Sequence, residues 1–249
     1  MNFLSKFSII VLLSTASYSV DVDKHLELSY VQTSGNTNTT TFSSKLEGTA
    51  GLSDTQSVRA KGSMLYNENE NNTSANKYNL ELDYNHMINK KLYANMGINY
   101  LKDELSDYDY RLNIGPGLGY KVLEDEIQTV DIQGGLDYAY DKYNDGSKDN
   151  YLAGRGELNY KYRFSENVEF KQMLSYLGSF EDSEKYFIVS DSSLEVNMTK
   201  NLSLGVSYNL DYTNQTEKEK LDKKFLTSLI VDFWYFQARI FPWITIKLS

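Results

Sequence analysis

The chain of 249 residues contains no cysteine and only two each of proline, tryptophan and histidine. Without cysteine there is no disulfide scaffold, no thiol catalysis and no thiolate metal site. The mean hydropathy is −0.51, and beyond the amino-terminal residues no apolar run approaches the roughly 20 residues that a membrane-spanning helix needs. Transmembrane helices are therefore excluded for residues 20–249.

Positive charge is also scarce. There are 25 Lys and Arg residues against 34 Asp and Glu residues, a formal net charge of −9. No basic run is longer than a pair such as Lys223 and Lys224. A nucleic-acid binder would carry a basic patch that follows the phosphate backbone. We therefore expect no nucleic-acid partner.

Residues 1–19 differ from the rest. Lys6 gives a positive start, an apolar run follows from Phe7 to Ala16, and Ser17 and Ser19 place small residues where a signal peptidase cuts. The alternative is a membrane anchor, but the run is about half of the roughly 20 residues that a spanning helix requires. The pattern predicts a signal peptide over residues 1–19 and a protein exported from the cytoplasm.

The abundant residue is tyrosine, at 21 positions, and the dominant pattern has a period of two. In Phe225–Phe233, FLTSLIVDF, the two faces of a strand separate the residues: one carries Phe225, Thr227, Leu229, Val231 and Phe233, and the other Leu226, Ser228, Ile230 and Asp232. Similar alternation recurs along the chain, with Gly, Asn, Asp and Ser between the runs. It predicts twelve strands, at residues 25–32, 39–52, 56–67, 77–88, 92–101, 108–123, 129–142, 151–164, 168–180, 186–198, 202–212 and 225–233.

The connections between these strands alternate between short turns and longer loops, which is typical of a transmembrane β-barrel. An all-β, antiparallel, up-and-down transmembrane barrel of about 12 strands over residues 20–233 is the predicted fold. The alternative is a secreted β-sandwich or lipocalin-like barrel, which buries its apolar face inside. Aromatic residues near the strand ends predict two interfacial belts, including Tyr66, Tyr78, Tyr100, Tyr108, Tyr110, Tyr140, Tyr151 and Tyr212 beside the longer loops.

Two features depart from this plan. Pro116 lies inside the sixth strand, between Gly115 and Gly117, and predicts a bulge or kink there. Residues 234–249, WYFQARIFPWITIKLS, continue past the terminal aromatic Phe233. They are either an added periplasmic tail or a reading-frame extension.

Three segments together resemble a known family. They are LELSYVQTSGNTNTTTFSSKLEG in the first hairpin, GPGLGYKV in the sixth strand and FLTSLIVDF at the end. Over most of residues 24–233 the chain is similar to the salt-induced outer-membrane proteins (YdiY-like), a domain family of unknown function. The resemblance implies an exported outer-membrane barrel, and it brings no catalytic residues to transfer.

No enzyme site follows from the residues either. Outer-membrane hydrolases use a histidine base near their outer loops, whereas His25 and His86 both fall near the predicted periplasmic turns. The acidic loop pair Asp145 and Asp149 lacks the spacing of a calcium loop. We expect no enzymatic activity, no cofactor and no metal.

The face predicted to point inward carries both signs of charge. These charges either line a narrow aqueous channel or pair across the interior and plug it. Twelve strands lie between barrels of about eight, which side chains fill, and porins of about sixteen, which leave a channel. The inward Gly115, Gly117 and Gly119 favour a small pore, although they could also admit Tyr93 or Met173. The predicted lumen-lining residues are Arg59, Lys61, Glu81, Asp83, Arg111, Lys121, Asp131, Asp137, Asp141, Arg155, Glu157, Lys161 and Arg163.

The sequence therefore predicts a bacterial outer-membrane barrel that is a small passive channel or an envelope-stress barrel. The alternative is a non-conducting structural or surface-interaction barrel, and a lipid-modifying enzyme ranks third. The expected partners are outer-membrane lipids and the barrel-assembly machinery, which would read the strand that ends at Phe233.

Overall fold

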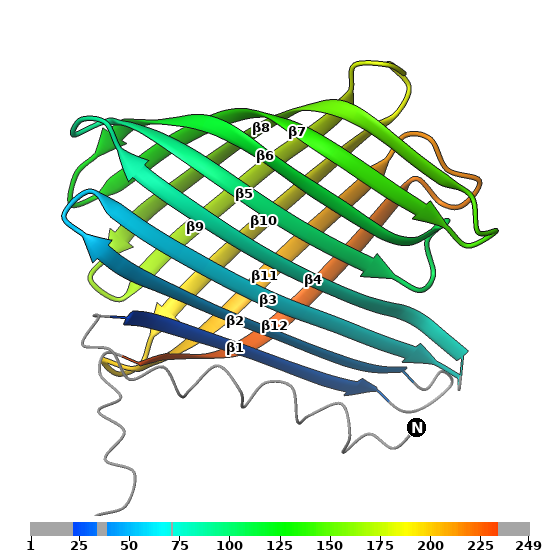
Figure 1. Cartoon of the computed structure of the whole chain (residues 1–249). Coiled ribbons are helices and arrows are strands. Elements are labelled where there is room, and N and C mark those ends of the chain that lie inside the picture. The colour runs from blue at the N-terminus through cyan, green and yellow to red at the C-terminus, as the bar shows by residue number, and fades with distance from the viewer. Residues whose placement is uncertain (1–21, 34–38, 71, 234–249) are drawn as a thin grey trace, which may run out of the picture.

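A computed structural model describes residues 22–33, 39–70 and 72–233. All regular structure in these residues is β-strand, arranged as one closed antiparallel barrel in which each strand pairs with its neighbours in sequence and β1 pairs with β12 (Figure 1). The strands are β1 (Val22–Thr33), β2 (Thr39–Ser53), β3 (Gln56–Asn69), β4 (Asn72–Met87), β5 (Leu92–Asp103), β6 (Tyr108–Glu124), β7 (Gln128–Tyr143), β8 (Lys148–Ser165), β9 (Val168–Ser179), β10 (Tyr186–Asn197), β11 (Leu202–Thr213) and β12 (Leu221–Phe233).

The predicted fold class and strand number are confirmed. No helix in the described part of the chain is long and apolar enough to cross a membrane. The predicted signal peptide and the carboxy-terminal tail lie outside the described residues, so both stay predictions.

The alternation of faces follows the sequence pattern. In β12, Phe225 is 66% exposed on the outside and Ile230 is 1% exposed on the inside. The outer surface is rich in apolar side chains, whereas serine, asparagine and charged side chains make up much of the interior. A wall with this distribution suits an apolar medium outside and a polar lumen inside.

Aromatic rings form a band near each end of the barrel. At the end that carries the connections 104–107, 144–147, 180–185 and 214–220, here called the loop end, Tyr110 packs against Tyr100 and Tyr140, and Tyr186 against Tyr176 and Tyr212. At the opposite, turn end, ring contacts join Tyr160, Tyr162, Phe164 and Phe170. This arrangement matches the expected interfacial belts.

Two tyrosines assigned to the loop-end belt lie inside the barrel instead. Tyr108 and Tyr151 are buried and belong to an interior cluster. A register shift between Tyr108 and Tyr110 turns Tyr108 inward. Tyr151 is inward by simple alternation, since its neighbour Leu152 is exposed on the outer face.

Several boundaries also differ from the prediction. The polar segment 68–73 was predicted as a loop, but β3 and β4 continue through most of it and leave a tight turn at Glu70. β12 begins at Leu221, so the last connection is shorter than predicted. Polar residues are compatible with strands here because the strands extend past the aromatic band.

Of the bulge or kink predicted at Pro116, the structure contradicts the bulge. Pro116 pairs with Met96 of β5, and the register with β7 is the same at Ile114 and at Gly117. Register shifts occur only near the two ends of the β6–β7 ladder. β6 therefore passes through Pro116 as a strand without an extra residue, although Gly115 and Pro116 have no register partners in β7.

Candidate functional site: the barrel interior

The barrel encloses a central cavity of about 670 Å³ whose lining includes residues from all twelve strands. Nine of the thirteen predicted lumen residues line it: Arg59, Lys61, Glu81, Asp83, Arg111, Asp137, Arg155, Glu157 and Lys161. They belong to β3, β4, β6, β7 and β8, and the period of two predicts an inward direction for each of them.

The other four predicted residues lie elsewhere. Lys121 binds Glu124 at the turn end, 2.8 Å from Nζ to Oε1, and Arg163 donates there to the carbonyl oxygen of Glu126. Asp131 accepts a hydrogen bond from the Tyr93 hydroxyl. Asp141 is fully buried within a side-chain cluster near the loop end.

Most lumen charges on one wall pair between neighbouring strands rather than across the interior. Arg59 and Asp83 are register partners in β3 and β4, as are Lys61 and Glu81. The Arg59 Nη2 to Asp83 Oδ2 distance is 2.9 Å, and the Lys61 Nζ to Glu81 Oε1 distance is 3.2 Å. Charges that are neutralised within the wall leave the middle of the cavity open.

The inward glycines of β6 do not leave the free space that the sequence suggests. Side chains from β5 and β7 meet over them: the Tyr93 hydroxyl donates to Asp131, and Asn95 Nδ2 donates to Gln133 at 2.8 Å. A Cβ at Gly119 would collide with the Tyr93 ring, and one at Gly117 with Asn95 and the Gly134 carbonyl. The glycines make room for this second layer, so the lumen is narrower on the β6 side.

A second cavity of about 450 Å³, here called the vestibule, lies at the loop end. Residues that line both cavities mark the ring where they meet: Leu65, Lys77, Leu101, Arg111, Asp211, Lys224 and Leu226. These side chains come from six different strands. The ring is the natural candidate for the constriction of the lumen.

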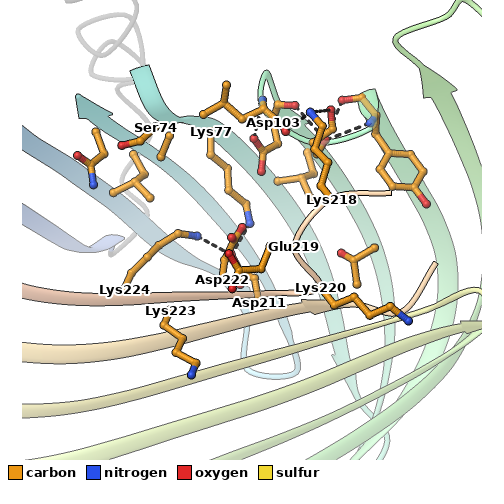
Figure 2. A pocket seen from close by; sticks show the side chains of 18 of the residues that line it. Ser74, Lys77, Asp103, Asp211, Lys218, Glu219, Lys220, Asp222, Lys223 and Lys224 are labelled. Carbon is orange, nitrogen blue, oxygen red and sulfur yellow. Dashed lines mark hydrogen bonds and ion pairs between the residues drawn. The ribbon is translucent and has the colours of Figure 1, made fainter. Parts of the chain in front are cut away.

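A three-residue bridge crosses the barrel at this ring. Lys77 of β4 lies 2.5 Å from Asp211 Oδ2 of β11, and Lys224 of β12 lies 2.8 Å from the same oxygen (Figure 2). The bridge could not be predicted from the sequence. Lys224 was expected in a loop, because the last predicted strand begins at Phe225, and alternation within one strand carries no information on partners across a barrel.

A buried cluster stiffens the wall near the loop end. Asp141 accepts hydrogen bonds from Arg111 Nε and the Tyr151 hydroxyl and binds Lys185 Nζ at 2.8 Å. The Arg111 guanidinium lies over the Phe187 ring at 3.3 Å from its centroid. Phe187 of β10 also faces inward, where it packs against the Arg111 cation and aromatic rings.

Lys185 joins this cluster from the connection 180–185. Burial alone would lower the pKa of its ammonium group, but hydrogen bonds to Asp141 and Asp149 raise it above its ordinary value. Lys185 is therefore charged at physiological pH, and it ties the β9–β10 connection to the wall.

The connection 214–220 reaches across the loop end. The Thr216 hydroxyl and the Glu217 N–H both donate to Asp107, and Lys218 Nζ donates to the carbonyl oxygens of Leu105 and Ser106. In the ring of strands, β5 and β6 lie half a turn away from β11 and β12. The connection, here called the strap, therefore spans the vestibule.

The two histidines remain near the turn end. His25 Nδ1 lies 2.7 Å from Asp232 Oδ1, and this pair joins β1 to β12. His86 is the register partner of Gln56 and Ala94. Among the described residues no three His, Asp or Glu side chains are grouped to hold a metal, and Asp145 accepts hydrogen bonds from Ser147.

A family model described as "Protein of unknown function, DUF481" matches residues 26–233. No curated protein matches the chain. The matched range contains all three segments on which the resemblance rests.

Solved structures share the architecture at low identity. The outer-membrane channel COG4313 of Pseudomonas putida F1 superposes with a TM-score of 0.55 at 10% identity, covering 88% of this chain and 97% of that one. The NanC porin gives 0.51 at 13% identity over 86% and 98%. The translocator domain of the autotransporter NalP of Neisseria meningitidis gives 0.50 at 10% identity over 92% and 93%. At these identities the likeness establishes the fold alone, that of outer-membrane barrels.

Proposed function

Because the chain belongs to the DUF481 family of proteins of unknown function, we propose that it is a bacterial outer-membrane barrel that passes small polar solutes through its lumen. The observation that carries the proposal is the polar cavity lined by residues of all twelve strands, which meets the vestibule at the loop end. The apolar outer face with its two aromatic bands supports placement in a bilayer. Solved porins and channels of the same fold support it further.

The proposal includes the route to the membrane. Residues 1–19 act as a cleaved signal peptide, and β12, which ends at Phe233, is the strand that the barrel-assembly machinery reads. Induction by salt, which the family resemblance implies, would make the protein part of an envelope-stress response.

The lining suggests which solutes pass. Among the described residues of the central cavity, nine are Lys or Arg and nine are Asp or Glu. Opposite charges in equal number give a lumen with little net field, so it attracts neither ion sign strongly. Small neutral or zwitterionic solutes fit this lining best.

Conductance of the refolded protein, residues 20–249, in a planar bilayer tests the proposal. We expect discrete steps whose cation-to-anion permeability ratio falls in Asp191→Asn and rises in Lys45→Gln. Both side chains line the central cavity, and neither has an ion pair among the described residues. Each substitution therefore changes the lumen charge without breaking a direct ion pair, as neutralising Asp137 beside Arg155 would.

The outcomes separate the competing functions. Insertion without steps, shown by heat-modifiable gel mobility, would favour the non-conducting structural or surface-interaction barrel. The side chains that meet over β6 and the Lys77–Asp211 bridge are the observations that favour that second candidate. Failure to insert at all would contradict the membrane assignment.

Tyr93→Ala tests whether the second layer over β6 limits the flow. Removing the ring that fills the space above Gly119 should raise the single-channel conductance, by less than about twofold because the bridge at the ring remains. Tyr120→Ala, which removes an outward-facing ring, serves as the matched control and should conduct like the unchanged protein. Equal conductance in both variants would mean that Tyr93 lies outside the conducting path.

An enzymatic role receives no support from the geometry. His25 is engaged with Asp232 and His86 lies beside the turn end, both away from the vestibule and strap. The solved structures of the same fold named above are channels and a translocator domain.

A further inference from the structure

The barrel closes along only part of its seam. β1 and β12 pair from Lys24 with Phe233 to Leu28 with Leu229, which is five residue pairs. Every other neighbouring pair of strands shares between ten and fifteen. Residues 29–33 of β1 and 221–228 of β12 run toward the loop end without pairing to each other.

The contacts of the β11–β12 hairpin explain the parting. The strap is held by Asp107 and by the carbonyl oxygens of the β5–β6 connection, on the opposite side of the ring. Asp211 is likewise held by Lys77 of β4. These bonds draw the loop end of the hairpin across the mouth and away from β1.

The vestibule extends around the unpaired edge of β12. Its lining includes Lys224 and Leu226, which point into the barrel, and also Lys223 and Phe225 of the outward face. A cavity confined to the lumen of a fully paired wall would meet one face of a strand only. The vestibule therefore reaches both faces of β12 at its unpaired edge, near the loop end of the barrel.

The chemistry of this side opening has two parts. Lys77 and Lys224 share a single carboxylate oxygen of Asp211, so the three side chains carry a net positive charge inside the wall. Figure 2 shows the two ammonium groups converging on that carboxylate from different strands. Leu65, Leu101 and Leu226 line the same vestibule and supply apolar surface next to the charge.

We propose that the opening between β1 and β12 is a lateral binding site for an amphiphile with one acidic headgroup. The carboxylate or phosphate head binds Lys77 and Lys224, and the apolar chain lies along Leu226 and leaves past Phe225 into the lipid. The inference rests on the proposed outer-membrane placement, because only there does the seam face acyl chains. It adds a lipid-side entrance to a lumen that otherwise opens toward water.

Binding to the protein, residues 20–249, in nanodiscs of zwitterionic lipid tests the chemistry. We expect radiolabelled dodecanoate to bind saturably, whereas dodecyltrimethylammonium, which has the opposite head, and propionate, which lacks the chain, fail to compete. Dodecyl phosphate should compete, and competition by inorganic phosphate alone would instead indicate a simple anion site. The double variant Lys77→Gln with Lys224→Gln should bind dodecanoate roughly tenfold less tightly or worse, because it loses two charged donors.

Lys200→Gln is the control, since Lys200 lies in a turn at the opposite end. Unchanged dodecanoate binding in the double variant, or an equal loss in the control, would overturn the proposal. The binding measurement does not depend on conduction. A barrel that binds dodecanoate but passes no current would therefore contradict the proposed channel function and support the lateral binding site. A barrel that conducts but does not bind dodecanoate would support the channel function and contradict the lateral binding site.

The seam itself can be tested because the chain has no cysteine. Cysteines at Leu26 and Val231, which are register partners, should form a disulfide on oxidation. Cysteines at Val31 and Leu226, where a continued register would place partners, should not. Rapid formation of the second disulfide would mean that the seam is closed to the loop end, and the lateral site would be excluded.

Discussion

Replacing Asp141 by alanine is expected to lower the free energy of unfolding of the barrel by about 3–5 kcal/mol. The Asp141 side chain is 0% exposed and lies between Arg111, 8% exposed, and Lys185, 2% exposed. Without the carboxylate, the buried cations of Arg111 and Lys185 face each other. Both of them, and the Tyr151 hydroxyl, lose the carboxylate that they share. Urea unfolding of the barrel refolded into lipid vesicles, followed by tyrosine and tryptophan fluorescence, measures the change.

Asp149→Ala is the matched control. Asp149 binds the same Lys185 ammonium at 2.8 Å, but its side chain is 49% exposed, so we expect a loss of less than about 1 kcal/mol. Asp141→Asn, which keeps the shape and an acceptor, should fall between the two. Equal losses for Asp141→Ala and Asp149→Ala would show that the cluster does not behave as a buried ion network.

Gly115→Ala is expected to destabilise the barrel by about 3 kcal/mol or more, or to prevent its assembly. An added Cβ would lie 2.7 Å from the Asp137 Cα, 2.5 Å from Asp137 Oδ1 and closer still to the carbonyl oxygen of Leu136. Two of these neighbours belong to the backbone of β7, which cannot move without disturbing its own ladders. The yield of heat-modifiable, folded protein and the urea midpoint report the effect.

Two other glycines calibrate that result. Gly156→Ala in β8 meets nothing within 4 Å and should leave stability within about 0.5 kcal/mol of the original. Gly119→Ala meets the ring of Tyr93, a side chain that can rotate, and should cost an intermediate amount. If Gly115→Ala folded as well as Gly156→Ala, the close approach of β6 and β7 would be contradicted.

The fold was predictable because a barrel wall imposes one simple rule on the sequence. Outside and inside differ in polarity at every position, so the period of two appears in almost every strand and identifies both the strands and their faces. Alternation alone predicts an inward direction for Arg59, Lys61, Glu81 and Asp83, and all four line the central cavity. Their pairing also follows once the β3–β4 turn is known, because the register sets them opposite each other.

What was missed depends on distances that no local pattern contains. Asp211 meets Lys77 across the lumen because twelve strands close into a ring, and the sequence separation of 134 residues gives no hint of it. The space over Gly119 is filled by Tyr93 from the next strand. Tyr108 was assigned to the wrong face because a single register shift inverts alternation at the end of β6.

The short ladder between β1 and β12 also determines the order in which the barrel assembles. Eleven of the twelve ladders join consecutive strands, so each can form as a hairpin with a small loss of chain entropy. The twelfth ladder must bring Leu28 to Leu229, near the other end of the chain, which costs more chain entropy than a hairpin does. Only five residue pairs offset this cost. Closure is therefore the last step in folding and the first to reverse. The side-chain contact between His25 and Asp232, which are themselves one of the five register pairs, then stabilises the closed barrel.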